Sequence, residues 1–132
     1  MTNWLQIIQD IAQDIFQELG TGFNEAIYQK AFEVALRERQ IKYEEQRKVP
    51  ILFHGYFVGE AIPDLILYDY DNDQAVVVVE LKAVQKVGDK EVKQVRKYME
   101  TLNIPLGVVV NFPTSTEADG IQITEVSLGS TL

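Results

Sequence analysis

The chain has 132 residues and a hydrophobic fraction of 46%, which predict one folded domain over residues 1–132 and exclude an intrinsically disordered chain. It contains no cysteine, so a disulfide framework and a thiolate zinc site are both excluded. Its net charge of −8 argues against broad nucleic-acid binding, because such binding depends on neutralising phosphates with Lys and Arg.

Two helices are predicted in the first third of the chain. Apolar residues recur three and four positions apart over residues 3–19, with Thr2 as the expected N-cap and Gly20 as the stop. A second helix is predicted from about residue 23 to residue 40. Its expected buried face consists of Phe23, Ile27, Ala31, Val34 and Ala35.

After Tyr43 the hydrophobic period changes from helical to alternating, which indicates strands. The strands are predicted at residues 49–53, 56–58, 62–68, 75–84, 106–112 and 121–126. His54-Gly55 is a tight-turn signal, and residues 113–120 are expected to form a loop. The run at 75–84 is rich in valine, which is typical of a central strand buried on both faces.

A third helix is predicted over residues 89–102, with Gly88 and Asp89 capping its start. Because it connects the strand at 75–84 to the strand at 106–112, a right-handed parallel crossover is expected. With residues 49–58 counted as one hairpin and the edge strand at 121–126 left out, the order α-α-β-β-β-α-β predicts an α/β domain with a central mixed β-sheet flanked by helices.

Three charged residues lie inside the predicted apolar strands. Glu80 and Lys82 follow four consecutive valines, and they share one face of the strand because strand side chains alternate. Asp64 lies in the strand at 62–68, and pairing through the turn at 69–73 would bring it beside Glu80. Such charges are costly in a buried sheet unless they are paired or bind a metal.

Two carboxylates and a lysine at strand ends are suited to phosphodiester chemistry. Asp64 and Glu80 are hard oxygen ligands for Mg²⁺ (or Mn²⁺), and the backbone carbonyl of Leu81 is a further candidate ligand. Lys82 would orient or deprotonate the attacking water. The alternative is a structural ion pair between Lys82 and either carboxylate, and the spacing alone favours neither.

Three motifs resemble a known superfamily. Pro63-Asp64, fifteen intervening residues and Glu80-Leu81-Lys82 resemble the signature of the PD-(D/E)XK nucleases. The segment 22–28 resembles the motif that names the GxxExxY family, a branch of that superfamily. Gln94 and Tyr98 resemble the Gln-x₃-Tyr element of the RecB-like nucleases. The resemblance implies the restriction-endonuclease-like PD-(D/E)XK fold.

The resemblance also implies roles outside the central strands. Glu25 is expected to supply a third acidic group to the metal site, although a carboxylate in a first helical turn also favours the helix dipole. Tyr28 fits either the site or the core. Gln94 and Tyr98 are expected to contact the substrate, and a solvated helix face is the alternative. The lysines expected to contact it with them are Lys86, Lys90 and Lys93.

The basic residues are unevenly distributed along the chain. Residues 82–97 hold six basic and two acidic side chains, a balance of +4, so the rest of the chain carries −12. This distribution predicts a focused phosphate contact in place of broad nucleic-acid binding.

These features favour a Mg²⁺-dependent nuclease with DNA as its expected substrate. The acidic balance and the small size support a non-catalytic interaction module on the same fold as the alternative, and a plain structural α/β protein is the third. A homodimer or a protein partner would add the surface that so short a chain lacks. We expect a cytoplasmic protein without a membrane partner, because no apolar run approaches the roughly 20 residues that span a bilayer.

Overall fold

The computed structural model describes residues 2–115 and 120–128, so residues 116–119 of the predicted loop lie outside the described residues. In chain order the elements are α1 (Trp4–Leu19), α2 (Glu25–Glu38), β1 (Tyr43–Glu45), β2 (Val49–Phe53), β3 (Tyr56–Ala61), β4 (Leu65–Tyr68), β5 (Ala75–Lys82), α3 (Asp89–Leu102), β6 (Leu106–Asn111) and β7 (Gln122–Ser127). Five strands form one sheet in the order β1-β4-β5-β6-β7.

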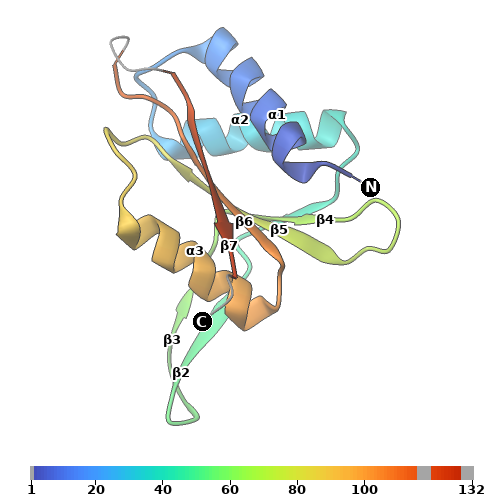
Figure 1. Cartoon of the computed structure of the whole chain (residues 1–132), viewed down its shortest axis with the longest axis vertical. Helices are drawn as coiled ribbons and strands as arrows, with labels where there is room; N and C mark the ends of the chain where they lie inside the picture. Colours follow the sequence, from blue (N-terminus) through green and yellow to red (C-terminus); the bar gives the residue numbers. More distant parts are fainter. Residues whose placement is uncertain (1, 116–119, 129–132) are drawn as a thin grey trace.

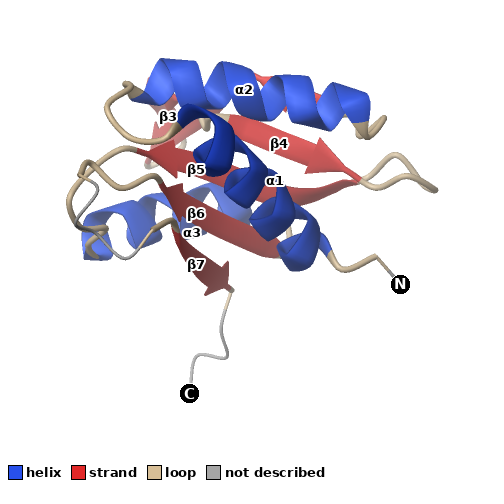
Figure 2. Ribbon diagram, turned by 90° about the horizontal axis from the view of Figure 1, so that it is seen from above, coloured by secondary structure: helices blue, strands red, loops and turns tan. Residues whose placement is uncertain are grey.

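The sheet is the middle of three layers. Figures 1 and 2 show α1 and α2 on one face and α3 on the other. Alternate residues of β5 therefore enter two separate cores: Val77, Val79 and Leu81 pack with α1 and α2, while Val78 packs with α3. Glu80 is two residues beyond Val78 and strand side chains alternate, so the Glu80 side chain also lies on the α3 face.

The sheet is mixed, as expected. β5 and β6 pair in parallel around α3, whereas the other neighbouring strands of the sheet pair antiparallel. The prediction of a central mixed sheet flanked by helices is confirmed. β1 was not anticipated, because its three residues show too short a pattern to indicate a strand without the partner β4.

Two local predictions for the helices are wrong. Asn3, and not Thr2, caps α1, because its side chain accepts a hydrogen bond of 3.1 Å from the Gln6 backbone N–H. The predicted inner face of α2 is buried only in part: Ala31 and Ala35 pack against the core, whereas Phe23, Ile27 and Val34 are 42%, 43% and 46% exposed. The fully buried apolar stripe consists of Tyr28, Phe32 and Leu36, which are spaced four residues apart.

β2 and β3 leave the main sheet and form a two-stranded sheet of their own. The hairpin projects away from the body past α3 (Figure 1). The predicted strand at 62–68 begins only at Leu65, since Pro63 has no N–H to donate to a ladder. The chain therefore bends at Asp64, between the hairpin and the main sheet.

Among the residues that the structure describes, no helix combines the length and apolar character required to cross a membrane.

Candidate active site

The pairing of β4 with β5 brings Asp64 and Glu80 together, as predicted. Leu65 lies opposite Val79, so Asp64 lies opposite Glu80 on the α3 face. The backbone N–H of Asp64 donates to the Glu80 carboxylate at 2.8 Å. The backbone N–H of Leu81 donates in turn to the Asp64 carboxylate at 2.7 Å. Each carboxylate is thus oriented by the backbone of the opposite strand.

These hydrogen bonds use one oxygen of each carboxylate, Oε1 of Glu80 and Oδ2 of Asp64. The second oxygen of each accepts no hydrogen bond within residues 2–115 and 120–128. No fully buried side-chain polar atom in that part of the chain lacks a partner, so the second oxygens must reach solvent. Two oriented carboxylate oxygens at the edge of a core are a donor set that fits a hard divalent cation.

Burial makes the negative charge of this pair costly. Glu80 is only 5% exposed. Desolvation, followed by the charge of Asp64, raises the pKa of Glu80 to about 8. Desolvation also raises the pKa of Asp64 above its ordinary value. A cation between the two groups would remove this cost, because buried carboxylates are stable as anions when they are paired or coordinate a metal.

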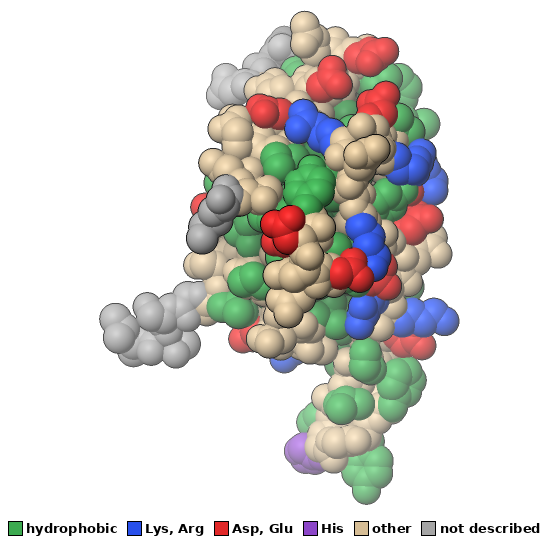
Figure 3. Space-filling view, turned by 90° about the vertical axis from the view of Figure 1, so that its right-hand side faces the viewer, with side chains coloured by type: hydrophobic (Ala, Val, Ile, Leu, Met, Phe, Trp, Pro, Cys, Tyr) green, Lys and Arg blue, Asp and Glu red, His purple; other side chains and the backbone are tan. Residues whose placement is uncertain are grey.

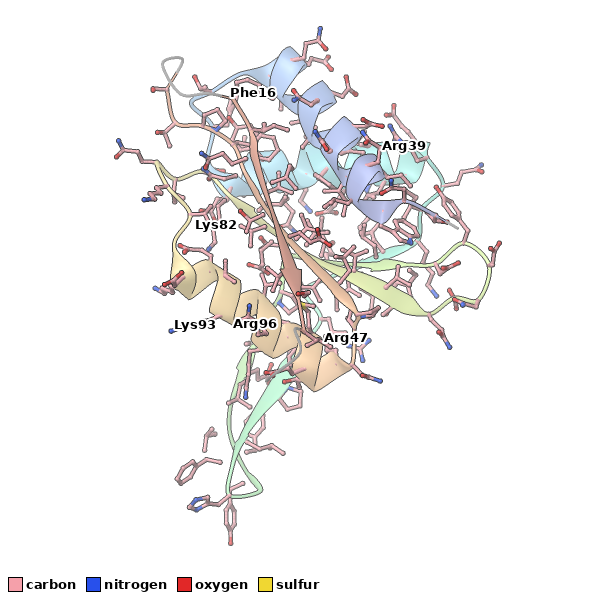
Figure 4. The ribbon with its side chains drawn as sticks, in the orientation of Figure 1. Phe16, Arg39, Arg47, Lys82, Lys93 and Arg96 are labelled. Atoms are coloured by element: carbon pink, nitrogen blue, oxygen red, sulfur yellow. The ribbon has the colours of Figure 1, made fainter. Side chains whose placement is uncertain are left out.

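Lys82 lies on the same face of β5, two residues beyond Glu80. Figure 4 shows it at the end of the strand, above the first turns of α3. Burial raises the pKa of both carboxylates, and the Lys82 charge partly opposes that rise. Among the described residues Lys82 forms no ion pair with either carboxylate, so the alternative of a structural ion pair is not what the structure shows.

The backbone carbonyl of Leu81 is directed toward the Asp64 side of β5. The carbonyl of Lys82 accepts a hydrogen bond of 2.9 Å from Phe112, on the β6 side. Neighbouring residues of a strand direct their backbone groups to opposite sides, so the backbone of Leu81 faces Asp64. Because β4 begins only at Leu65, opposite Val79, no strand residue covers that carbonyl.

Glu25 is the first residue of α2, where the side chain of Asn24 caps the helix through a bond of 3.2 Å to the Ile27 N–H. Burial is the largest cause of the raised pKa of Asp64 and of Glu80, and the charge of Glu25 is the smallest contribution to the same rise. Within the described ranges no three acidic or histidine side chains converge as a ready metal cluster. The structure therefore brings Asp64 and Glu80 together, whereas Glu25 contributes only a weak charge interaction with them.

Gln29 is a residue of the site that the sequence analysis missed. It lies one helical turn after Glu25, and its side-chain amide donates to the backbone carbonyl of Asp64 at 3.3 Å. The same nitrogen lies 3.3 Å from the carboxylate of Glu33, which is buried. A cleft of about 350 Å³ opens beside Asp64, and the residues that line it are Gln29, Gln46, Ile62, Pro63 and Asp64.

The Gln94 and Tyr98 pair is present on α3, but the two residues differ in exposure. The amide of Gln94 donates to the hydroxyl of Tyr98 at 3.1 Å. Gln94 is exposed, whereas Tyr98 is 2% exposed and packs in the core with Val95 and Met99. The ring of Tyr98 is covered on the apolar side of the helix, and its hydroxyl holds the Gln94 amide in place.

The three lysines expected to contact the substrate are all exposed. Lys90 and Lys93 lie in the first turns of α3, and Lys86 lies in the loop that precedes the helix. The negative charges of Glu80 and Asp64 also reach this helix: burial first, then Glu80, raise the pKa of the Tyr98 hydroxyl.

Tyr28, which the sequence left open between site and core, belongs to the core. It is 1% exposed, and its ring stacks on Phe112 with centroids 4.1 Å apart. Its hydroxyl donates to the carbonyl of Gly20 at 2.7 Å, which ties the start of α2 to the end of α1.

The chain is similar to known proteins in sequence profile and in fold. Residues 2–123 match the sequence profile of the PD-(D/E)XK nuclease superfamily. No curated protein sequence is significantly similar to the chain.

Solved structures share the fold at low sequence identity. The crystal structure of SSO0001 matches with a TM-score of 0.58 and 17% identity, over 94% of this chain and 56% of that one. The alkaline exonuclease LHK-Exo from Laribacter hongkongensis matches with a TM-score of 0.52 and 13% identity, over 96% of this chain and 72% of that one. Its complex with dAMP matches with a TM-score of 0.52 and 12% identity, over 92% and 67%. Such identities show a shared fold, and the chain spans little more than half the length of SSO0001. Since the superfamily profile extends over nearly all of the sequence, the chain belongs to the PD-(D/E)XK nuclease superfamily.

Proposed function

We propose that this chain is a divalent-metal-dependent nuclease that hydrolyses phosphodiester bonds in DNA. The observation that carries the proposal is the Asp64–Glu80 pair: a half-buried and a buried carboxylate, each oriented by a backbone N–H of the opposite segment and each with one oxygen free. The solved complex of LHK-Exo with dAMP supports DNA as the substrate, because that exonuclease has the same fold. The motif at residues 22–28 supports membership of the GxxExxY branch.

In this proposal Asp64, Glu80 and the carbonyl of Leu81 hold Mg²⁺ (or Mn²⁺). Glu25 would add a third acidic group to this metal site. The bound ion would polarise the scissile phosphate and lower the pKa of a bound water. Lys82 directs its ammonium group at the attacking water and orients that water toward phosphorus.

The substrate is held by groups on and before α3. Lys86, Lys90 and Lys93 neutralise phosphates flanking the scissile bond. The Gln94 amide, fixed by its 3.1 Å bond to Tyr98, donates to a phosphate oxygen. Gln29 acts indirectly, because it holds the backbone of Asp64 in position.

The decisive experiment measures cleavage of DNA by the purified chain with Mg²⁺ or Mn²⁺. Asp64→Asn should abolish cleavage, and Lys82→Ala should slow it by about 10²-fold or more. Asp14→Asn, which alters an exposed carboxylate on α1, is the matched control and should cleave at the wild-type rate. Metal-dependent cleavage that survives both Asp64→Asn and Lys82→Ala would refute the assignment.

The net charge of −8 supports a second candidate, a non-catalytic module that acts with a protein partner. Calorimetric titration separates the two. A nuclease should bind Mn²⁺ and lose that binding in Asp64→Asn, whereas a module should show no heat of binding at millimolar ion. In both cases we propose that residues 1–132 act as one domain, with a homodimer or partner adding surface, which sedimentation velocity would detect.

A further inference from the structure

The β2–β3 hairpin exposes apolar side chains that no part of the described structure covers. Figure 3 shows it as an apolar projection with the single histidine, His54, at its tip. The exposed side chains are Leu52 (59%), Phe53 (61%), Tyr56 (76%), Phe57 (62%) and Val58 (60%). Exposed apolar patches of this kind mark interaction sites on soluble proteins.

Both faces of the hairpin are apolar near its tip. Leu52 pairs with Phe57, and the next pair, Phe53 with Tyr56, lies on the opposite face because side chains alternate. His54 and Gly55 form the turn with φ of 51° and 81°, and two positive values in succession are typical of a tight two-residue turn. The rings are therefore presented on a short, well-defined tip, with Phe53 stacked on His54 at 4.0 Å.

The hairpin is structurally continuous with the candidate active site. β3 ends at Ala61, three residues before Asp64, and Val49 at the start of β2 packs in the same core as Tyr98. A groove of about 230 Å³ separates the hairpin from α3, and the residues that line it are Pro50, Ile51, Leu52, Lys97 and Thr101. Lys97 is one helical turn beyond Gln94, so one helix surface connects the site to the groove.

Charge and ring chemistry together indicate the class of partner. Glu60 is the acidic side chain of the hairpin and Arg47 is paired with Glu44 at 2.9 Å, so the basic groups that border the rings are Lys48 and Lys97. Lys48 at the root of the hairpin and Lys97 across the groove are both exposed. A second copy of this chain would meet the surface with the same net charge of −8, whereas a polyanion is attracted to its basic border. Aromatic rings beside lysines are the combination that binds unpaired bases and their phosphates.

We propose that the hairpin tip stacks on unpaired bases of the nucleic acid bound at the candidate active site. Phe53, Tyr56 and Phe57 present the rings, and Lys97 contacts the phosphate between the stacked bases and the scissile bond. The substrate is accordingly a nucleic acid with a single-stranded or frayed segment on the α3 side of the site. This inference rests on the proposed nuclease function.

The test compares a duplex carrying a short single-stranded tail with the same duplex made blunt, both in Ca²⁺ so that binding is measured without cleavage. 2-Aminopurine in the tail reports stacking on the protein. The combined variant Phe53→Ala, Tyr56→Ala and Phe57→Ala should bind the tailed DNA about tenfold more weakly or worse, and leave the blunt duplex nearly unchanged. The 2-aminopurine signal should return to that of free DNA.

Two further variants separate stacking from other effects. Tyr70→Ala removes an aromatic ring of similar exposure, 52%, outside the hairpin, and should bind both substrates as the wild type does. Phe57→Leu keeps an apolar side chain but loses the ring, and should reproduce part of the loss. Circular dichroism and melting temperature of the hairpin variants should match the wild type, because the side chains altered in the hairpin are exposed.

Equal affinity of the combined variant and the wild type for tailed DNA would overturn the inference. So would a change from dimer to monomer, seen by sedimentation velocity, without any change in DNA affinity, since the hairpin would then contact a second copy. A cleavage assay in Mg²⁺ tests the nuclease proposal independently. Cleavage that requires Asp64 but not the hairpin rings refutes only the stacking. Absence of metal-dependent cleavage refutes the nuclease.

Discussion

The buried Glu80 carboxylate should make the stability of the metal-free protein depend on pH, and Glu80→Gln should remove that dependence. An unfolded glutamic acid loses its proton near its ordinary pKa of 4.5, whereas the pKa of folded Glu80 is raised to about 8. Between these values the folded state binds more protons, so the free energy of unfolding falls as the pH rises and then levels off. Glutamine keeps the oxygen that accepts from the Asp64 N–H and carries no charge.

The size of the effect follows from the shift in pKa. At about 1.4 kcal/mol per unit, a rise from 4.5 to about 8 corresponds to a loss of at most about 5 kcal/mol across this range. Because Glu80 is 5% exposed, solvent screens little of this cost, although relaxation of the structure around neighbouring Asp64 will reduce it. We expect Glu80→Gln to match the wild type at about pH 4.5 and to exceed it by a few kcal/mol at about pH 9.

The assay is guanidinium unfolding in EDTA over this pH range, followed by circular dichroism and by the fluorescence of Trp4, which is buried and stacked on Tyr70. Glu18→Gln changes an exposed carboxylate and should follow the wild-type curve. Mg²⁺ at 100 times its Kd should return about 2.7 kcal/mol to the wild type at high pH, and nothing to Glu80→Gln. A constant stability difference between Glu80→Gln and the wild type from acid to alkaline pH would refute the reasoning.

Two other substitutions test the surroundings of the site. Gln29→Ala removes the amide that holds the Asp64 carbonyl at 3.3 Å, and should weaken Mn²⁺ binding about tenfold in a calorimetric titration; unchanged affinity would show that Gln29 does not support the site. Gly107→Ala places a Cβ against Val95 and within 2.5 Å of the Met99 sulfur, so it should lower the unfolding free energy by about 1–3 kcal/mol in guanidinium. A Gly107→Ala protein as stable as the wild type would mean that α3 moves away from β6 without cost.

The sequence alone identified the charged residues that lie within apolar segments. Asp64 and Glu80 are conspicuous as charges in apolar strands, and the turn at 69–73 implies the antiparallel pairing that the structure has. The bounds of α3 were also predicted correctly, because its caps and its period are local signals. Patterns of this kind are encoded within a few neighbouring residues, so they can be recognised without knowledge of the fold.

The tertiary structure decided what depends on distant partners. α2 has two apolar stripes of similar spacing, and only the position of the sheet determines that Tyr28, Phe32 and Leu36 are the buried ones. The role of Gln29 requires Asp64, a residue 35 positions away, to lie within hydrogen-bonding distance. Alternation predicts β2 and β3 as strands but does not say that they leave the main sheet, because strand propensity carries no information about which strand is the neighbour. For this reason the carboxylate pair was predictable from the sequence, while the hairpin and its exposed rings could be found only in the folded chain.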